Sequence, residues 1–216
     1  MKIGILGTGM VGATLGTKLA ELGHEVKMGS RTANNEKAAK WVSENGTNAS
    51  QGTFAEATAF GNVVFNCTKG EGALEAVKAA GEKGLNGKVL VDVSNPLDFS
   101  KGMPPSLYAS LSNTNSLGEE IQKTIPDAKV VKALNTMSCG LMVNQTLVPG
   151  SHDLFICGND VPAKAMVTDI LTSFGWTSII DLGDITAARG TEMLLPIWVR
   201  LMMKYQSPNF NFKIVR

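Results

Sequence analysis

The sequence predicts an α/β fold, in which helices cover both faces of a doubly wound, mostly parallel sheet and a short helical segment follows at the C-terminus. Short β-branched, apolar runs alternate with helical patterns along most of the chain, which is the order of a parallel sheet with right-handed crossovers. Runs such as Val89–Val93 are also nearly continuously apolar, as expected of strands that are buried on both faces.

Strands are expected at the apolar runs, and helices where apolar residues recur every three or four positions. The expected strands are Lys2–Leu6, Glu25–Met28, Val63–Cys67, Lys88–Val93, Lys129–Leu134, Asp153–Cys157 and Ser178–Asp181. The expected helices between them are Met10–Leu22, Glu36–Glu44, Gly72–Lys83, Leu117–Thr124 and Pro162–Phe174.

The pattern changes after Asp181. Asp184 is a candidate N-cap, and Ile185–Lys204 is predicted to form one long helix that bends at Pro196. Phe210, Phe212 and Ile214 alternate in the tail, which predicts a terminal strand within Asn209–Val215.

The middle of the long predicted helix is apolar on all sides, so it must be buried against the sheet, a second subunit, or both. Its apolar stripe fits either the core or a dimer interface and consists of Met193, Leu194, Ile197, Trp198, Leu201 and Met202. We therefore divide the chain near Gly158 into a large unit, residues 1–158, and a small C-terminal unit, residues 159–216.

Composition excludes several classes of partner. The 216 residues carry a net charge of +1, so no basic surplus indicates a nucleic acid or an anionic membrane. The longest apolar run is interrupted by Arg200 and is too short to span a bilayer. The start, MKIGILGTG, does not have the pattern of a signal peptide. We expect a soluble, cytoplasmic protein.

The three cysteines are an odd set without CxxC spacing, so neither a disulfide framework nor a metal site is expected. Free thiols fit a reducing compartment. Cys67 and Cys157 fall within expected strands and are interpreted as small core residues, which leaves Cys139 as the one nearest a ligand.

A glycine motif of the form GxGxxG follows the first expected strand and opens a helical pattern, and this context indicates a Rossmann-type dinucleotide-binding turn. The motif consists of Gly7, Thr8, Gly9, Met10, Val11 and Gly12. Gly7 permits the tight turn, Gly9 lets a pyrophosphate approach the backbone, and Gly12 allows close helix packing. The amides of Met10 and Val11 lie where the helix N-terminus attracts an anion.

The end of the second expected strand indicates which dinucleotide is bound. An NAD site usually places a carboxylate there, but residues 26–35 contain none. Gly29 leaves room, Ser30 offers a hydrogen bond, and Arg31 can bind a phosphate bidentately. Lys37 adds a second positive charge. We therefore predict NADP(H) as the cofactor.

Five blocks along the chain form a recognisable set: Gly7–Gly12, Gly29–Arg31, Asp92–Pro96, Lys132–Asn135 and Cys157–Asp160. A segment bearing Glu192 and Pro196 follows them and is expected to be helical. In these blocks and in the position of this helix, the sequence resembles a known family, the coenzyme F420-dependent NADP oxidoreductases, and the related oxidoreductase domain of the STEAP metalloreductases.

The resemblance implies transfer of a hydride between NADP(H) and a flavin or 5-deazaflavin, and often a homodimer or higher oligomer. The acceptor can be F420, FMN or FAD. Such a transfer requires mainly close, parallel placement of two flat rings. We therefore assign no catalytic acid or base and expect the enzyme to act by positioning.

Ligands of open α/β sheets bind beyond the carboxyl ends of the strands. The resemblance places Thr68 and the segment Ser94–Pro96 near the ribose and nicotinamide of the cofactor, and Asn135 with Thr136 near the acceptor ring. Residue by residue, these candidates are Thr68, Ser94, Asn95, Pro96, Asn135 and Thr136.

The loop of residues 97–115 ends at an expected capping box formed by Ser116 and Glu119. A connection of this length is usually functional. It is either a lid that closes over the acceptor, with Met103 and Tyr108 as contacts, or a mobile surface loop.

Two other functions remain open. One is a pyrroline-carboxylate or imine reductase-like, or hydroxyacid dehydrogenase-like, enzyme, although residues 159–216 are few for the longer helical domain of those families. The other is a non-enzymatic NADP(H)-binding sensor. No basic cluster marks a site for the polyglutamyl tail of F420, so the acceptor also stays open.

Overall fold

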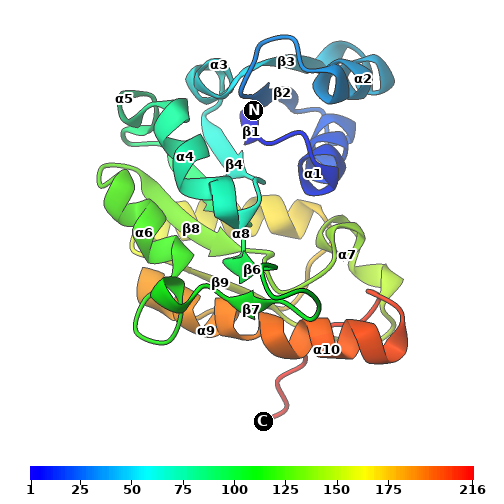
Figure 1. Cartoon of the computed structure of the whole chain (residues 1–216). Coiled ribbons are helices and arrows are strands. Elements are labelled where there is room, and N and C mark those ends of the chain that lie inside the picture. The colour runs from blue at the N-terminus through cyan, green and yellow to red at the C-terminus, as the bar shows by residue number, and fades with distance from the viewer.

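The computed structural model describes all residues, 1–216, and has one eight-stranded sheet in the order β10-β9-β8-β5-β4-β1-β2-β3 (Figure 1). Adjacent strands are parallel except β8 and β9. The fold class predicted from the sequence is thus confirmed. The strands are β1 (Lys2–Leu6), β2 (Glu25–Ser30), β3 (Ala49–Thr53), β4 (Val63–Asn66), β5 (Val89–Asp92), β8 (Lys129–Ala133), β9 (Leu154–Gly158) and β10 (Ile179–Asp181).

Helices cover both faces of the sheet. The helices are α1 (Met10–Glu21), α2 (Glu36–Asn45), α3 (Phe54–Phe60), α4 (Gly70–Ala80), α5 (Glu82–Leu85), α6 (Leu117–Thr124), α7 (Cys139–Val143), α8 (Val161–Ser173), α9 (Ala188–Met193) and α10 (Leu195–Tyr205). Apolar residues of α1, α2, α7 and α8 form one core with one face of the sheet. Those of α3, α4, α6 and α9 form a second core on the other face.

Two of the elements that the sequence did not predict, β3 and α3, lie next to each other in the chain. The β3 segment reads Ala-Ser-Gln-Gly-Thr and lies at the edge of the sheet, so its polar side chains carry no strand signal. The α3 helix begins at a capping box in which Thr53 and Glu56 bond each other's backbone amides. The capping-box pattern, Thr-x-x-Glu at residues 53–56, is visible in the sequence and could have predicted the start of this helix.

The prediction of one helix over Ile185–Lys204 was wrong. A 3-10 turn at Ile185–Ala187 leads into α9, and a break at Leu194 separates α9 from α10. Pro196 lies in the first turn of α10, and it has no amide hydrogen to continue the bonding of the preceding helix. Leu194 itself keeps helical backbone angles, φ −71° and ψ −19°, so the helix is interrupted in its hydrogen bonding close to Pro196, where a bend was expected.

The predicted terminal strand at Asn209–Val215 was also wrong, because these residues join no sheet. The Asp153 amide donates to the carbonyl of Phe212 at 2.9 Å, and the Ile214 amide donates to the Asp153 carboxylate at 2.6 Å. A side chain thus takes the acceptor position that a neighbouring strand would supply.

The apolar stripe of the C-terminal helices is not the face that packs on the core. The fully buried residues of α10 are Leu195 and Val199, whereas Met193 and Ile197 are 42% and 52% exposed. The other four residues of the stripe, Leu194, Trp198, Leu201 and Met202, are half-buried, so the stripe is only partly covered within the chain and the dimer interface stays a prediction. In the whole chain, no helix has the length and apolar character needed to cross a membrane.

Candidate functional site

The glycine motif forms the turn between β1 and α1, and two of its glycines are required by the fold. Gly7 has φ +118°, and a Cβ on it would lie 2.9 Å from the carbonyl oxygen of Cys67. A Cβ on Gly12 would lie 2.2 Å from the carbonyl oxygen of Gly7. A side chain at Gly7 would thus collide with the backbone that follows β4, and one at Gly12 would push α1 away from the turn.

Gly9 differs from the other two, because nothing lies within 4 Å of the position that a Cβ would take. Its φ of −79° is open to any residue. The missing side chain therefore leaves free space at the start of α1, and this space suits a ligand that approaches the backbone.

The N-terminus of α1 is built to accept an anion. Gly9 is the N-cap and offers no capping side chain, and the first turn has no acidic residue. The first intrahelical bond runs from Ala13 N to Gly9 O at 2.9 Å, so the amides of Met10, Val11 and Gly12 are left without partners in the helix. These amides and the helix dipole fit a pyrophosphate. Thr8 is half-buried in the same turn.

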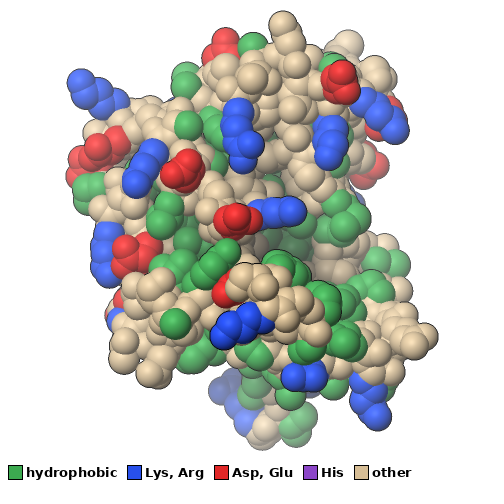
Figure 2. All heavy atoms as spheres, viewed as in Figure 1, with side chains coloured by type: hydrophobic (Ala, Val, Ile, Leu, Met, Phe, Trp, Pro, Cys, Tyr) green, Lys and Arg blue, Asp and Glu red, His purple; other side chains and the backbone are tan.

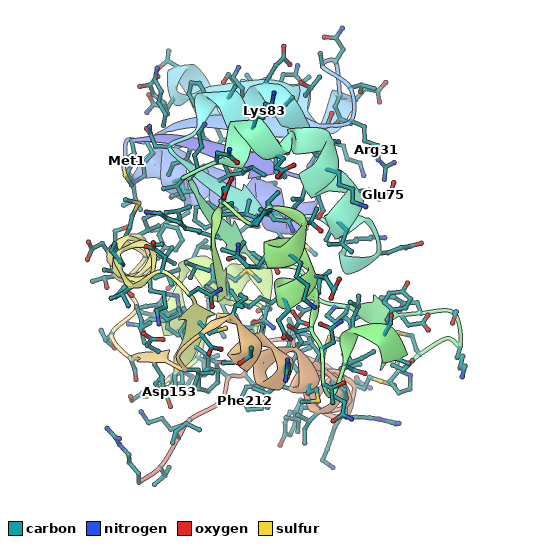
Figure 3. All side chains as sticks on the ribbon, turned by 90° about the vertical axis from the view of Figure 1, so that its left-hand side faces the viewer. Met1, Arg31, Glu75, Lys83, Asp153 and Phe212 are labelled. Carbon is teal, nitrogen blue, oxygen red and sulfur yellow. The ribbon has the colours of Figure 1, made fainter.

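Two positive side chains stand beyond the end of β2. Arg31 and Lys37 are exposed, and neither forms a salt bridge. Figure 3 shows Arg31 pointing outward on the side of the molecule opposite Met1, which is the side of the carboxyl ends of the parallel strands. Both charges are free to meet a phosphate.

Ser30 and Gly29 have structural roles that the sequence did not indicate. The Ser30 hydroxyl donates to Thr32 O at 2.5 Å and accepts from Thr32 N at 3.2 Å, so it shapes the turn. A Cβ on Gly29 would lie 2.8 Å from the Ala57 Cβ. Gly29 therefore leaves room for α3, and whether it also leaves room for the phosphate stays a prediction.

The polar candidates at the sheet edge meet in one connected network. Asn95 Nδ2 donates to Asn135 O at 2.8 Å, and Asn135 Nδ2 donates to Asn95 Oδ1 at 3.0 Å. Thr68 Oγ1 donates to Asn66 Oδ1 at 2.7 Å, and Asn66 Nδ2 in turn donates to Asp92 Oδ1 at 2.9 Å. Loops that follow three different strands are thus tied together.

Backbone geometry holds the same edge. Leu134 is buried with φ +64°, a conformation uncommon for a bulky residue and frequent near functional sites. It turns the chain so that Asn135 and Thr136, both buried, follow at the end of β8. A Cβ on Gly70 would lie 1.9 Å from Asn95 O, so α4 begins in direct contact with the Asn95–Pro96 backbone.

A row of buried polar side chains lies beneath this edge, and sequence reasoning assigned it no role. Asn66, Asp92 and Lys132 are partners in the register of β4, β5 and β8. Lys132 Nζ donates to Asp92 Oδ2 at 2.7 Å and to Ser94 O at 2.6 Å. The signal was a polar residue at or next to the end of three apolar strands, VVFN, VLVD and KVVKA.

Glu192 of α9 completes the row. Its Oε1 lies 2.7 Å from Lys132 Nζ, and its carboxylate also accepts from the amides of Leu117 and Gly118 at 2.8 and 3.0 Å. The side chains of Lys132 and Asp92 are fully buried, and that of Glu192 is 1% exposed. No sequence motif predicts these contacts, because Glu192 lies 60 or more positions after Lys132, Leu117 and Gly118 in the sequence.

Burial and charge compete within this cluster. Burial works to lower the pKa of Lys132, but Asp92 and Glu192 outweigh it and hold that pKa above its ordinary value. Burial raises the pKa of Glu192, and Lys132 offsets this only in part. The two carboxylates therefore favour the protonated form of Lys132 despite its burial.

The loop of residues 97–115 is ordered and contains a small hairpin of β6 (Leu97–Asp98) and β7 (Ser106–Leu107). Figure 2 shows the molecular surface hollowed between the part that carries α1 to α4 and the part that carries this hairpin and α10. The Tyr108 amide donates to Pro96 O at 3.0 Å, whereas Met103 is 58% exposed. Whether the loop closes as a lid stays a prediction.

The expected capping box at the end of this loop was half right. Ser116 caps α6 by accepting from Glu119 N at 3.1 Å. The Glu119 carboxylate, however, accepts from the Ser116 hydroxyl and from Arg189 of α9. The side chain that the motif assigned to the cap therefore links two helices.

The cysteines are all free. Burial raises the pKa of the Cys157 thiol to about 12 and that of the Cys67 thiol further still, so neither is a thiolate at neutral pH. Cys139 is half-buried at the start of α7.

Comparisons with known proteins relate this chain to NADP-dependent oxidoreductases of one family. A family model described as "NADP oxidoreductase coenzyme F420-dependent" matches residues 2–96. The F420-dependent NADP reductase of Methanocaldococcus jannaschii is 30% identical over 224 residues, which cover 99% of this chain and 98% of the relative. The metalloreductase STEAP3 of Rattus norvegicus is 31% identical over 91% of this chain but only 38% of its own length.

A solved structure is similar over the full length. The crystal structure of a putative F420-dependent NADP-reductase from Arthrobacter sp. FB24 has a TM-score of 0.94 and 50% sequence identity, and the match covers 100% of both chains. A reductive aminase from Aspergillus terreus is 18% identical with a TM-score of 0.66, and the match covers 63% of that chain. That second likeness concerns the fold alone.

Proposed function

Because this chain belongs to the family of coenzyme F420-dependent NADP oxidoreductases and is an NADP-dependent oxidoreductase, we propose that it transfers a hydride between NADP(H) and a flavin or 5-deazaflavin acceptor. The observation that carries the proposal is the juxtaposition of a free helix N-terminus, two unpaired cations and a polar strand-end network at one sheet edge. F420 is the first candidate acceptor, and FMN and FAD are the others.

The adenosine half of the cofactor is assigned to the turn between β1 and α1 and to the end of β2. The amides of Met10, Val11 and Gly12 bind the pyrophosphate, for which Gly9 leaves space. Arg31 and Lys37 bind the 2′-phosphate, because both are exposed and free of carboxylate partners.

The nicotinamide half is assigned to the loops that follow β4 and β5. Thr68 and the segment Ser94–Pro96 line its place, and Asn135 with Thr136 face the acceptor ring. NADPH supplies the hydride, so these residues need only orient two rings and exclude water. No acid or base is required of them.

We also propose that residues 1–158 bind the cofactor, and that residues 159–216 complete the acceptor pocket and form a homodimer contact. Met193, Ile197 and Met203 of this unit are each more than 40% exposed, and exposed apolar patches often mark protein contacts. Three free thiols suit a reducing compartment, so we assign the protein to the cytoplasm.

The decisive experiment mixes the protein and NADPH with a panel of F420, FMN, FAD and cyclic imines, and follows NADPH oxidation together with acceptor bleaching. We expect turnover with at least one flavin-type acceptor and none with imines. Turnover with imines alone would favour an imine reductase-like enzyme. Binding of NADPH without any turnover would favour a sensor.

A further inference from the structure

We propose that Lys132 and Glu192 are positioning residues that set the nicotinamide end of the cofactor site by holding the Ser94–Pro96 segment in place. The inference rests on the proposed assignment of that segment to the nicotinamide. It concerns a buried cluster that makes no contact with either ligand in the proposed site and acts through the segment above it.

The cluster lies in an apolar environment. Asn66, Asp92 and Lys132 each lie two positions after an apolar residue on the same face of the sheet. These apolar residues, Val64, Leu90 and Val130, belong to the second core. Charges placed there lose their hydration, and this loss opposes folding. Apolar residues of similar size often give equal or greater stability. Stability alone therefore does not account for this row.

Lys132 is held in a single orientation. Its ammonium group has three protons and three acceptors, namely Asp92 Oδ2 at 2.7 Å, Glu192 Oε1 at 2.7 Å and Ser94 O at 2.6 Å. The third of these is a backbone carbonyl of the proposed nicotinamide site. Lys132 thus bridges the two buried carboxylates and the Ser94 carbonyl, so the carboxylates fix where that carbonyl lies.

Asp92 holds the same segment from its other side. Its Oδ1 accepts from Ser94 N at 3.2 Å and from the Ser94 hydroxyl at 2.7 Å. Asp92 Oδ1 also accepts from Asn66, which binds Thr68. Every bond that fixes Ser94 therefore comes from this cluster.

Glu192 connects the cluster to the C-terminal unit. It bonds the first two amides of α6, where the helix dipole favours a carboxylate. A Cβ on Gly118 would lie 2.9 Å from the Ala188 Cβ, so α6 and α9 meet at a glycine and bring Glu192 to Lys132. The C-terminal unit thereby reaches the cofactor site through one carboxylate.

The test compares three variants. Glu192→Gln removes one charge and places an amide donor where Leu117 or Gly118 also donates. The double variant Lys132→Met/Glu192→Gln frees the Ser94 carbonyl without leaving two unpaired carboxylates. Glu119→Gln is the matched control, because the Glu119–Arg189 pair also joins α6 to α9 but does not touch Ser94.

Affinity is measured for NADPH and for 2′,5′-ADP, which carries only the adenosine end. For Glu192→Gln and the double variant we expect NADPH affinity or kcat to fall about tenfold, since small displacements of positioning groups are costly. Affinity for 2′,5′-ADP should stay within about twofold. Glu119→Gln should change neither ligand by more than this, although it lowers the unfolding free energy.

Equal losses for both ligands, an unchanged NADPH affinity and kcat in the double variant, or the same split in Glu119→Gln would overturn the positioning role. The proposed function fails in a different way. One outcome is that the unchanged protein binds NADPH but reduces no flavin-type acceptor, while the Glu192 variants lose affinity for NADPH and keep it for 2′,5′-ADP. In that case the acceptor assignment is wrong and the positioning role stands. If it binds neither ligand, the cofactor site and this inference both fall.

Discussion

The positively charged side chains of this protein have different roles, depending on whether they are exposed or buried. Arg31 is exposed and has no carboxylate partner, so its full charge is available to a ligand. Lys132 is fully buried between two carboxylates, so its charge interacts with the protein and is not available to a ligand. A net charge of +1 conceals both roles.

Replacement of Arg31 by alanine should weaken NADPH binding by about 1–3 kcal/mol, because a charge-assisted bond to the 2′-phosphate is lost. NADH binding should hardly change, since NADH lacks that phosphate. Both affinities can be measured by the quenching of protein fluorescence. Arg200→Ala, which removes an exposed arginine of α10, is the control, and equal losses for both cofactors in Arg31→Ala would contradict the NADP assignment.

Two glycines of the same turn should respond in opposite ways to alanine. Gly9→Ala should fold with an unfolding free energy within about 1 kcal/mol of the unchanged protein, because its Cβ meets open space. It should nevertheless weaken NADPH binding about tenfold or more, since the methyl group displaces the pyrophosphate from the helix N-terminus.

Gly12→Ala is the matched comparison. Its Cβ would collide with the Gly7 carbonyl oxygen, so the unfolding free energy should fall by about 1–3 kcal/mol. Urea titrations with and without NADPH separate the two effects. A stable Gly9→Ala that binds NADPH normally would show that the free space is not the pyrophosphate site.

Among the elements, the strands and the first helices follow from local pattern, whereas the C-terminal helices and tail depend on distant contacts. Pro196 marks an interruption of the helix that the sequence could predict, but which residues of α9 and α10 are buried depends on the partners they meet in the fold. The tail is held by Asp153, which accepts from Ile214 N at 2.6 Å and from Ser178 Oγ at 2.6 Å. A carboxylate that organises a tail 60 residues away leaves no periodic signal.

This tail should loosen in acid. Burial works to raise the pKa of Asp153, but the bonds from Ile214, Ser178 and Lys213 outweigh it and hold the pKa below its ordinary value. The contribution of Asp153 to stability is therefore present above the unfolded value of about 3.9 and is lost as the pH falls through the lower folded value.

Urea unfolding of Asp153→Asn and of the unchanged protein measures this contribution as a difference between two unfolding free energies. The difference should be constant near neutral pH and shrink below about pH 4. Asp169→Asn is the control, because Asp169 is an exposed residue of α8 whose carboxylate forms no salt bridge or side-chain hydrogen bond. A difference that stays constant down to about pH 2 would contradict the role of the charged carboxylate.

For the molecule as a whole, the C-terminal unit shows two different sides. Glu192 is buried and bonded to the sheet domain, while Met193, Ile197 and Met203 face outward. We propose the exposed apolar face as a subunit contact, and Glu192 connects the same unit to the proposed cofactor site.

Sedimentation velocity should therefore detect a homodimer, and Ile197→Glu should shift it to the monomer, because a charge would be buried at the contact. Val161→Glu is the matched control, since Val161 is a 70% exposed apolar residue on α8. A dimer that persists in Ile197→Glu, or an unchanged protein that is monomeric, would contradict the assignment of this face.

The sequence by itself determined the alternation of strands and helices, the glycine turn and the absence of a carboxylate after β2, because each of these depends on residues that are neighbours along the chain. Only the tertiary structure decided which strand ends face one another. Asn66, Asp92, Lys132 and Glu192 come from β4, β5, β8 and α9, and sheet register and helix packing bring them together. The nicotinamide end of the proposed site is therefore a product of folding, whereas its pyrophosphate end could be predicted from residues 7–12.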